Sequence, residues 1–181
     1  YFNTSSVDIS WSTDPEADSY TVTLDDGTPV NVGGSTSYTL TPVSDGAHTV
    51  NVTSYMSGSP VNTVSVSFTV DTVVPTLTIN SPAYGSWLNV TTVNVTWSAS
   101  DPGSGIKNTS VSMDGGVWTE IITDYYEFTS LADGQHTVMV RAYDNALNYR
   151  ESNKVFNIDT STPSVTVTEP SSGETVIGSS V

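Results

Sequence analysis

The chain repeats one short motif: residues 45–50 are Asp-Gly-Ala-His-Thr-Val, and residues 133–138 are Asp-Gly-Gln-His-Thr-Val. The same separation of 88 residues relates Phe-Thr-Val-Asp-Thr at 68–72 to Phe-Asn-Ile-Asp-Thr at 156–160. Similarity at a fixed period indicates a chain built from copies of one folding unit. The sequence therefore predicts two copies of a unit of about 88 residues.

The repeated segments alternate between apolar and polar residues. Val-Asp-Ile-Ser-Trp at 7–11 matches Val-Asn-Val-Thr-Trp at 93–97, with the apolar residues at every second position. Such alternation is typical of strands with one buried face, and Asp-Gly pairs at 45–46 and 133–134 favour tight turns between them. The chain is also rich in Ser, Thr and Val and shows no helical period. Each unit is therefore predicted to be an all-β sandwich of about seven short strands.

Further segments carry a resemblance to a known family. They are Leu-Ala-Asp-Gly-Gln-His-Thr-Val at 131–138, Ala-Tyr-Asp-Asn-Ala at 142–146, and Ile-Asp-Thr at 158–160 before Pro163. With the Trp-containing strand, they resemble the tandem Ig-like repeats, related to fibronectin type III, of archaeal and bacterial surface proteins. The resemblance implies tandem Ig-like (fibronectin type III-like) β-sandwiches and an extracellular location at the cell surface. It implies no particular function, because this fold serves many purposes.

The repeat divides the chain into three parts. Unit one is predicted to comprise residues 1–72 and unit two residues 73–160. Residues 161–181 follow as the first strand of a further repeat or as a donor strand.

The first strand of the repeat is present in unit two but has no counterpart in unit one. This strand is Thr-Leu-Thr-Ile at 76–79, and Pro-Ser-Val-Thr-Val-Thr at 163–168 supplies its pattern once more, with Val165 and Val167 at the apolar positions. A sandwich without this strand exposes an edge that another strand can pair with. Two explanations are open. The chain is either a section of a longer array, which the sequence favours, or it inserts about residues 161–175 into unit one of the next copy.

Charge and composition exclude several classes of function. The chain has 4 Lys and Arg against 19 Asp and Glu, a net charge of −15, and the first 88 residues contain no cation. Such a chain repels nucleic acid and anionic lipid, so we expect neither as a partner. No apolar run approaches the roughly 20 residues that cross a bilayer, and the absence of Cys excludes disulfides and thiolate chemistry.

No catalytic motif is recognisable, and we expect that the protein is not an enzyme. His48 and His136 occupy equivalent positions in the two units, which favours a structural role over a base or metal ligand. We expect no cofactor, with calcium as the one ion considered, because acidic loops are usually solvated turns. The weak calcium candidates are Asp14, Glu16, Asp18, Asp144, Asn145 and Asn148, and carboxylates at the unit junctions, Asp71 and Asp159, are also considered.

Five Asn-x-Ser/Thr sequons make glycans possible partners, although chance accounts for most of them in a chain so rich in Ser and Thr. The sequons are at Asn3, Asn51, Asn89, Asn94 and Asn108. The expected function is structural: a component of an extracellular stalk, surface layer, sheath or filament, whose partners are neighbouring repeats or other copies of the chain. The alternative is an adhesion or carbohydrate-binding module of a surface protein.

Overall fold

The computed structural model describes residues 1–168, 172–173 and 178, and within them every regular element is a β-strand. The strands of unit one are β1 (Val7–Ser10), β2 (Ser19–Leu24), β3 (Val30–Gly33), β4 (Ser37–Leu40), β5 (Gly46–Met56) and β6 (Ser59–Val70). Those of unit two are β7 (Thr76–Ser81), β8 (Trp87–Leu88), β9 (Val93–Ser100), β10 (Ile106–Met113), β11 (Thr119–Ile121), β12 (Tyr125–Phe128), β13 (Gly134–Asp144) and β14 (Tyr149–Ile158).

Each unit consists of two sheets that enclose one apolar core. In unit two, a sheet of order β11-β10-β13-β14-β8 faces a sheet of order β12-β9-β7. In unit one, the sheet β3-β2-β5-β6 faces a sheet of only β1 and β4. All pairings are antiparallel except that of β8 with β14.

The cores are formed by the residues that alternate inward along these strands. Along β13, every second residue from His136 to Asp144 is buried, because successive side chains of a strand point to opposite faces. The core of unit two is centred on Trp97 and Phe156, and that of unit one on Val22 and Val70. The all-β sandwich fold predicted from the alternation is confirmed.

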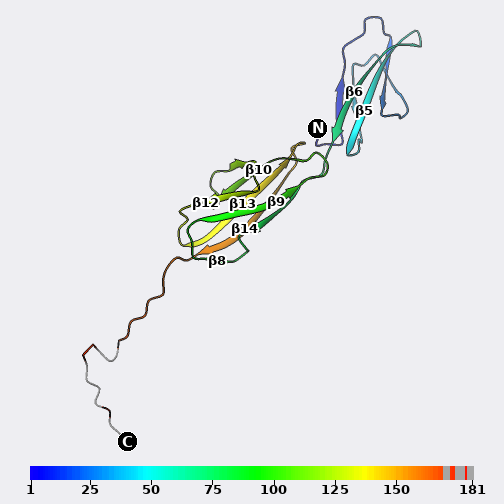
Figure 1. Cartoon of the computed structure of the whole chain (residues 1–181). Coiled ribbons are helices and arrows are strands. Elements are labelled where there is room, and N and C mark those ends of the chain that lie inside the picture. Colours follow the sequence, from blue (N-terminus) through cyan, green and yellow to red (C-terminus); the bar gives the residue numbers. More distant parts are fainter. Residues whose placement is uncertain (169–171, 174–177, 179–181) are drawn as a thin grey trace.

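The two sandwiches lie end to end, and Tyr1 lies near the junction between them (Figure 1). Residues 161–168 form no strand or helix and extend away from the far end of unit two (Figure 1). Of the expected donor segment 161–175, residues 169–171, 174 and 175 lie outside the described residues, as do 176, 177 and 179–181 of the third part. The described residues form no helix long and apolar enough to cross a membrane.

Candidate functional site

The two units differ at one sheet edge. In unit two, β7 pairs with β9, with Leu77 opposite Ala99 and Ile79 opposite Trp97. The equivalent of β9 in unit one is β1, and in the described part of the chain β1 pairs only with β4. The edge of β1 that corresponds to the β7-bearing edge of β9 is therefore unpaired there.

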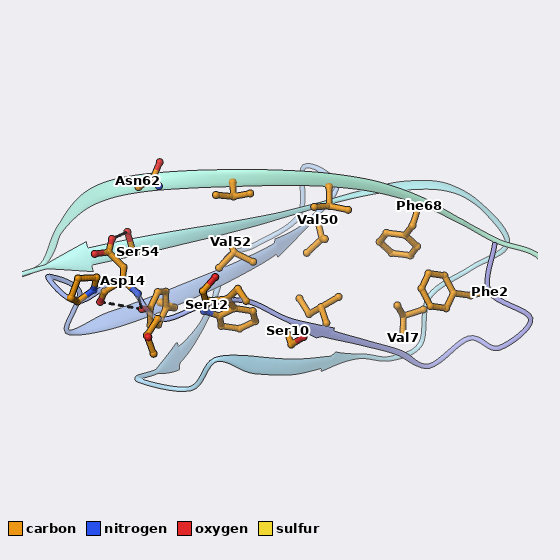
Figure 2. A pocket seen from close by; sticks show the side chains of 17 residues that line it. Phe2, Val7, Ser10, Ser12, Asp14, Val50, Val52, Ser54, Asn62 and Phe68 are labelled. Carbon is orange, nitrogen blue, oxygen red and sulfur yellow. Dashed lines mark hydrogen bonds between the residues drawn. The ribbon is translucent and has the colours of Figure 1, made fainter.

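A groove of about 780 Å³ opens beside this edge, between the segment from β1 to Pro15 and the inner face of β5 and β6. Phe2 and Phe68 lie at one end of the groove, and Asp14 and Asn62 lie at the other (Figure 2). The complete lining is Phe2, Val7, Ile9, Ser10, Trp11, Ser12, Thr13, Asp14, Pro15, Tyr20, Val50, Val52, Ser54, Asn62, Val64, Val66 and Phe68. The groove thus exposes part of the sandwich interior.

Two valines of β6 are exposed in this groove. Val64 and Val66 are 58% and 57% exposed, although both line the interior side. The equivalent positions of β14, 88 residues later, hold Ser152 and Lys154. Unit one is therefore more apolar than unit two at the place where its sandwich is open.

A strand pattern that suits this groove is exposed elsewhere in the chain. Residues 163–168 match residues 75–80 position by position, so that Val165 and Val167 correspond to Leu77 and Ile79. Ile79 is 2% exposed in the core of unit two, whereas Val165 and Val167 are 91% and 77% exposed. The described chain therefore contains both an unpaired strand edge in unit one and an exposed segment with the sequence pattern of β7.

The linkers that leave the two units are held in the same way. Asp45 accepts hydrogen bonds from the backbone N–H and the hydroxyl of Thr72, and Asp133 accepts the same two bonds from Thr160. These bonds from Thr160 lower the pKa of Asp133. Residues 160–163 therefore leave unit two as residues 72–75 leave unit one.

The junction between the units holds a second candidate site, formed by three carboxylates. Asp71 follows β6 of unit one, Asp101 follows β9 of unit two, and Asp144 ends β13. One oxygen of each lies within 4.8 Å of the others. Asp71 and Asp144 are 2% and 0% exposed. Carboxylate oxygens gathered in this way are the ligands of hard cations.

Hydrogen bonds account for only some of these oxygens. Asn148 donates to both oxygens of Asp144 through its backbone and side-chain N–H groups, at 2.8 and 2.9 Å. One oxygen of Asp71 accepts from the N–H of Val73, and one oxygen of Asp101 accepts from the loop N–H groups of residues 104 and 105. Oδ2 of Asp71 and Oδ2 of Asp101 are buried and have no partner.

Backbone loops of unit two enclose the cluster. A Cβ on Gly103 would lie 2.7 Å from the carboxylate of Asp71, so this loop approaches Asp71 as closely as only glycine permits. The side chain of Asn145 donates to the carbonyls of Ser104 and Gly105 and ties the two loops together. Of the six calcium candidates, Asp144 belongs to the cluster, and Asn145 and Asn148 support it.

The other candidates lie outside this cluster. One oxygen of Asp14 accepts from the N–H of Glu16 and the other from the hydroxyl of Ser54. Asp18 accepts from Ser57, and the only cluster of three or more potential metal ligands within the described ranges is the one at the junction. Asp159 is exposed. Asp101 was not predicted as a ligand, because its repeat equivalence to Asp14 is the only signal it carries in the sequence.

The two histidines make matching contacts. His48 Nδ1 lies 3.0 Å from Asp25 and its Nε2 lies 2.8 Å from the carbonyl of Ser44. His136 bonds Asp114 and the carbonyl of Ala132 at 2.7 and 2.8 Å. Each ring also packs on a phenylalanine. Each histidine side chain thus links a turn to the strand that contains the histidine, which is a structural role.

The pKa of His48 is raised, chiefly by its hydrogen bond to Asp25 and then by its bond to the Ser44 carbonyl, and the same contact lowers the pKa of Asp25. Burial alone would lower the pKa of His136, but its bonds to Ala132 and Asp114 outweigh burial and raise that pKa. Both imidazoles therefore favour the protonated form more than a free histidine does.

Some aromatic side chains are engaged by their own chain, and others, such as Tyr84 and Trp87, are exposed. The guanidinium of Arg141 lies 4.4 Å from the ring centre of Trp118 and also contacts Tyr149, so these rings are engaged by a cation of their own chain. Trp87 is 71% exposed. Among the sequons, Asn3, Asn89 and Asn94 are exposed, and Asn51 and Asn108 are partly buried.

Parts of the chain are similar to known Ig-like and fibronectin-like proteins. Residues 75–140 match the family model of the bacterial Ig domain. The fibronectin(III)-like modules of Clostridium thermocellum CbhA are structurally similar over 87% of both chains, at 18% identity and a TM-score of 0.53. A segment of two fibronectin type III domains from chicken tenascin matches 87% of this chain and 94% of that one, at 11% identity and a TM-score of 0.41.

Three N-terminal domains of the bacteriophage RB49 Highly Immunogenic Outer Capsid protein match 87% of this chain and 55% of theirs, at 15% identity and a TM-score of 0.46. No curated protein matches in sequence. The likeness to the Clostridium modules shows the fold alone. The chain therefore has the fibronectin type III-like fold in two tandem sandwiches, and residues 75–140 of the second resemble the bacterial Ig domain.

Proposed function

We propose that this protein is a non-enzymatic structural component of an extracellular surface assembly, in which unit one accepts a strand of the β7 type from residues 161–175 of another copy. The observation that carries the proposal is the open groove beside β1 together with the exposed β7 pattern at 163–168. Bacterial Ig domains and fibronectin-like modules are frequent in surface proteins, which supports the extracellular setting.

The groove and the strand have complementary chemistry. In the register of β7 on β9, Val167 lies opposite Trp11 and Val165 opposite Thr13, with both valines facing Val64 and Val66. Full burial of an exposed valine contributes about 1.5–3 kcal/mol, and a strand added to a free edge also satisfies its backbone groups. The intervening residues, Ser164 and Thr166, then face solvent.

The linker gives the added strand a direction. Because residues 160–163 leave unit two as residues 72–75 leave unit one, a donated strand enters unit one of the next copy as β7 enters unit two. At each contact between copies, the donated strand then repeats the pairing of β7 with β9. Such a head-to-tail contact does not close on itself and extends into a filament.

The test is the mass and shape of the full chain, measured by light scattering and electron microscopy. We expect the full chain to form rods and the chain ending at Thr160 to remain monomeric. A synthetic peptide of residues 161–175 should bind the truncated chain. It should not bind the Val66→Asp variant of that chain. The double variant Val165→Asp/Val167→Asp should abolish rods.

The matched control is Ser164→Asp/Thr166→Asp, which adds the same charge to the opposite face of the same strand and should preserve rods. The alternative is that the strand that fills the groove comes from the preceding part of a longer polypeptide. In that case the peptide binds the groove but the full chain stays monomeric, which rejects strand exchange between copies. Absence of peptide binding rejects the groove as a strand acceptor.

The adhesion alternative would rest on the exposed aromatic residues Tyr84 and Trp87, since Trp118 is engaged by Arg141.

A further inference from the structure

We propose that the carboxylates of Asp71, Asp101 and Asp144 form a calcium site at the junction between the two units. This site is independent of strand donation, since every ligand belongs to one chain. The inference begins from two buried oxygens, Oδ2 of Asp71 and Oδ2 of Asp101, that have no hydrogen-bond partner. Only 2% of the surface of Asp71 is exposed.

An unpartnered carboxylate oxygen in such a place is costly. Burying a charge without a partner is strongly unfavourable, and here three carboxylates converge within 4.8 Å. The ion pairs found in the described residues join His48 to Asp25, His136 to Asp114 and Arg141 to Glu151, and none reaches the junction. A bound divalent cation supplies the missing positive charge.

The spacing suits calcium. Calcium–oxygen distances are about 2.3–2.6 Å, so two oxygens on opposite sides of one calcium lie about 4.6–5.2 Å apart. One carboxylate oxygen of each residue lies within 4.8 Å of the others, which is compatible with this span. Magnesium demands a strict octahedron and retains several waters, so it is less suited than calcium to a site of three protein carboxylates. With no nitrogen or sulfur ligand in the cluster, a hard cation is favoured over a transition metal.

Unit one provides an internal comparison. Asp14 is the repeat equivalent of Asp101, but both of its oxygens are satisfied, one by the N–H of Glu16 and the other by Ser54. The equivalent of Asp144 in unit one is Met56, and that of Ser54 in unit two is Ala142. At the junction, therefore, the methyl group of Ala142 stands in place of the Ser54 hydroxyl. Asp144 adds a carboxylate there that unit one lacks at the equivalent position.

The position of the site gives it a role. Asp71 belongs to the end of unit one, whereas Asp101 and Asp144 belong to unit two. The side chain of Asn148 already donates to the carbonyls of Asp71 and Val73 as well as to Asp144, so the linker is drawn against unit two. A calcium ion shared by the three carboxylates fixes the angle between the two sandwiches.

The test is calorimetric titration of the full chain with calcium chloride after dialysis against a chelator, together with melting curves in both conditions. We expect one ion per chain and a dissociation constant of about 10⁻³ M or tighter, in the range of extracellular calcium modules. Calcium should raise the melting temperature, because it binds the folded chain and not the unfolded one. Magnesium should bind more weakly.

The informative variants are Asp71→Asn and Asp101→Asn, which keep an oxygen for the loop N–H groups and remove a charge. Each should weaken calcium binding at least about tenfold, because affinity follows the charge of the ligand set. The matched control is Asp159→Asn, the exposed repeat equivalent of Asp71, which should bind calcium as the parent does.

In chelator, Asp71→Asn should melt at or above the parent temperature, because it removes an uncompensated buried charge. A carboxylate with a purely structural role predicts the opposite, a lower melting temperature with and without calcium. No binding heat and no melting shift at about 10⁻² M calcium, ten times the weakest affinity expected of such modules, overturns the proposal. Binding that both substitutions leave unchanged overturns it as well.

Discussion

At the scale of single residues, the same contact between a histidine and an aspartate occurs in both units. His48 and His136 each connect a turn carboxylate to a carbonyl in the loop before the histidine's own strand, at distances of 2.7 to 3.0 Å. Asp25 and Asp114 adopt φ angles of 50° and 52° in these turns, and each also accepts the N–H of the residue after the histidine. The histidines therefore stabilise a strained turn in each unit, which explains their repetition without any catalysis.

This arrangement predicts a dependence of stability on pH. The folded-state pKa of both histidines lies above the ordinary value of 6.5, so their contribution is complete below pH 6.5 and is lost as pH rises through the folded-state pKa. Asp25, whose pKa is lowered from 3.8, contributes above that value and loses its contribution as pH falls through its folded-state pKa. The melting temperature should therefore decline as pH rises from 6 to 8, as scanning calorimetry can measure.

The control is the double variant His48→Gln/His136→Gln. It should melt below the parent at pH 6, and its melting temperature should change little between pH 6 and 8. An equal decline in parent and variant would show that other groups cause it.

At the scale of elements, β7 is the strand that distinguishes the two units. Its pairing with β9 completes the smaller sheet of unit two and buries Ile79 against Trp97. In unit one the same edge is open, and Val64 and Val66 of β6 are more than half exposed. The short strands β3, β8 and β11 were not predicted; β1 is as short as β3 but was recognised because its alternation recurs at 93–97.

A pair of substitutions measures what β7 contributes. Ile79→Ala should destabilise unit two by about 2–5 kcal/mol, because it leaves a cavity in a close-packed core. Val167→Ala, at the equivalent repeat position but 77% exposed, should change the stability of the monomer by less than about 0.5 kcal/mol. Denaturant unfolding of dilute protein provides both values. A large loss for Val167→Ala in the monomer would mean that residues 163–168 pack on their own chain.

At the scale of the whole molecule, charge controls how copies meet. The net charge is −15, and all four cations lie in unit two, at Lys107, Arg141, Arg150 and Lys154. Net repulsion between acidic copies opposes a head-to-tail contact, although the cations of unit two favour the cation-free surface of unit one locally. The net charge is the stronger of the two effects at long range, because −15 charges per chain stand against only 4 cations.

Assembly should therefore increase with salt. In the presence of chelator, rods should be scarce at about 0.01 M sodium chloride, where the screening length is about 30 Å, and abundant at about 1 M, where it is about 3 Å. Light scattering across this range provides the measurement. Dissociation of rods by salt would show instead that local ion pairs hold the copies together.

The repeat, the all-β class and the β7 pattern at 163–168 were predictable from the amino-acid sequence. Strand alternation and turn residues are local properties, and a repeat of 88 residues is visible wherever Asp-Gly-x-His-Thr-Val recurs. That Asp71, Asp101 and Asp144 form one cluster depends on the tertiary structure, because they lie at the ends of three strands whose distance apart depends on how the sandwiches close and dock. The tertiary structure also decided that Val64 and Val66 line an open groove, since burial depends on what packs opposite a strand and not on the strand's own residues.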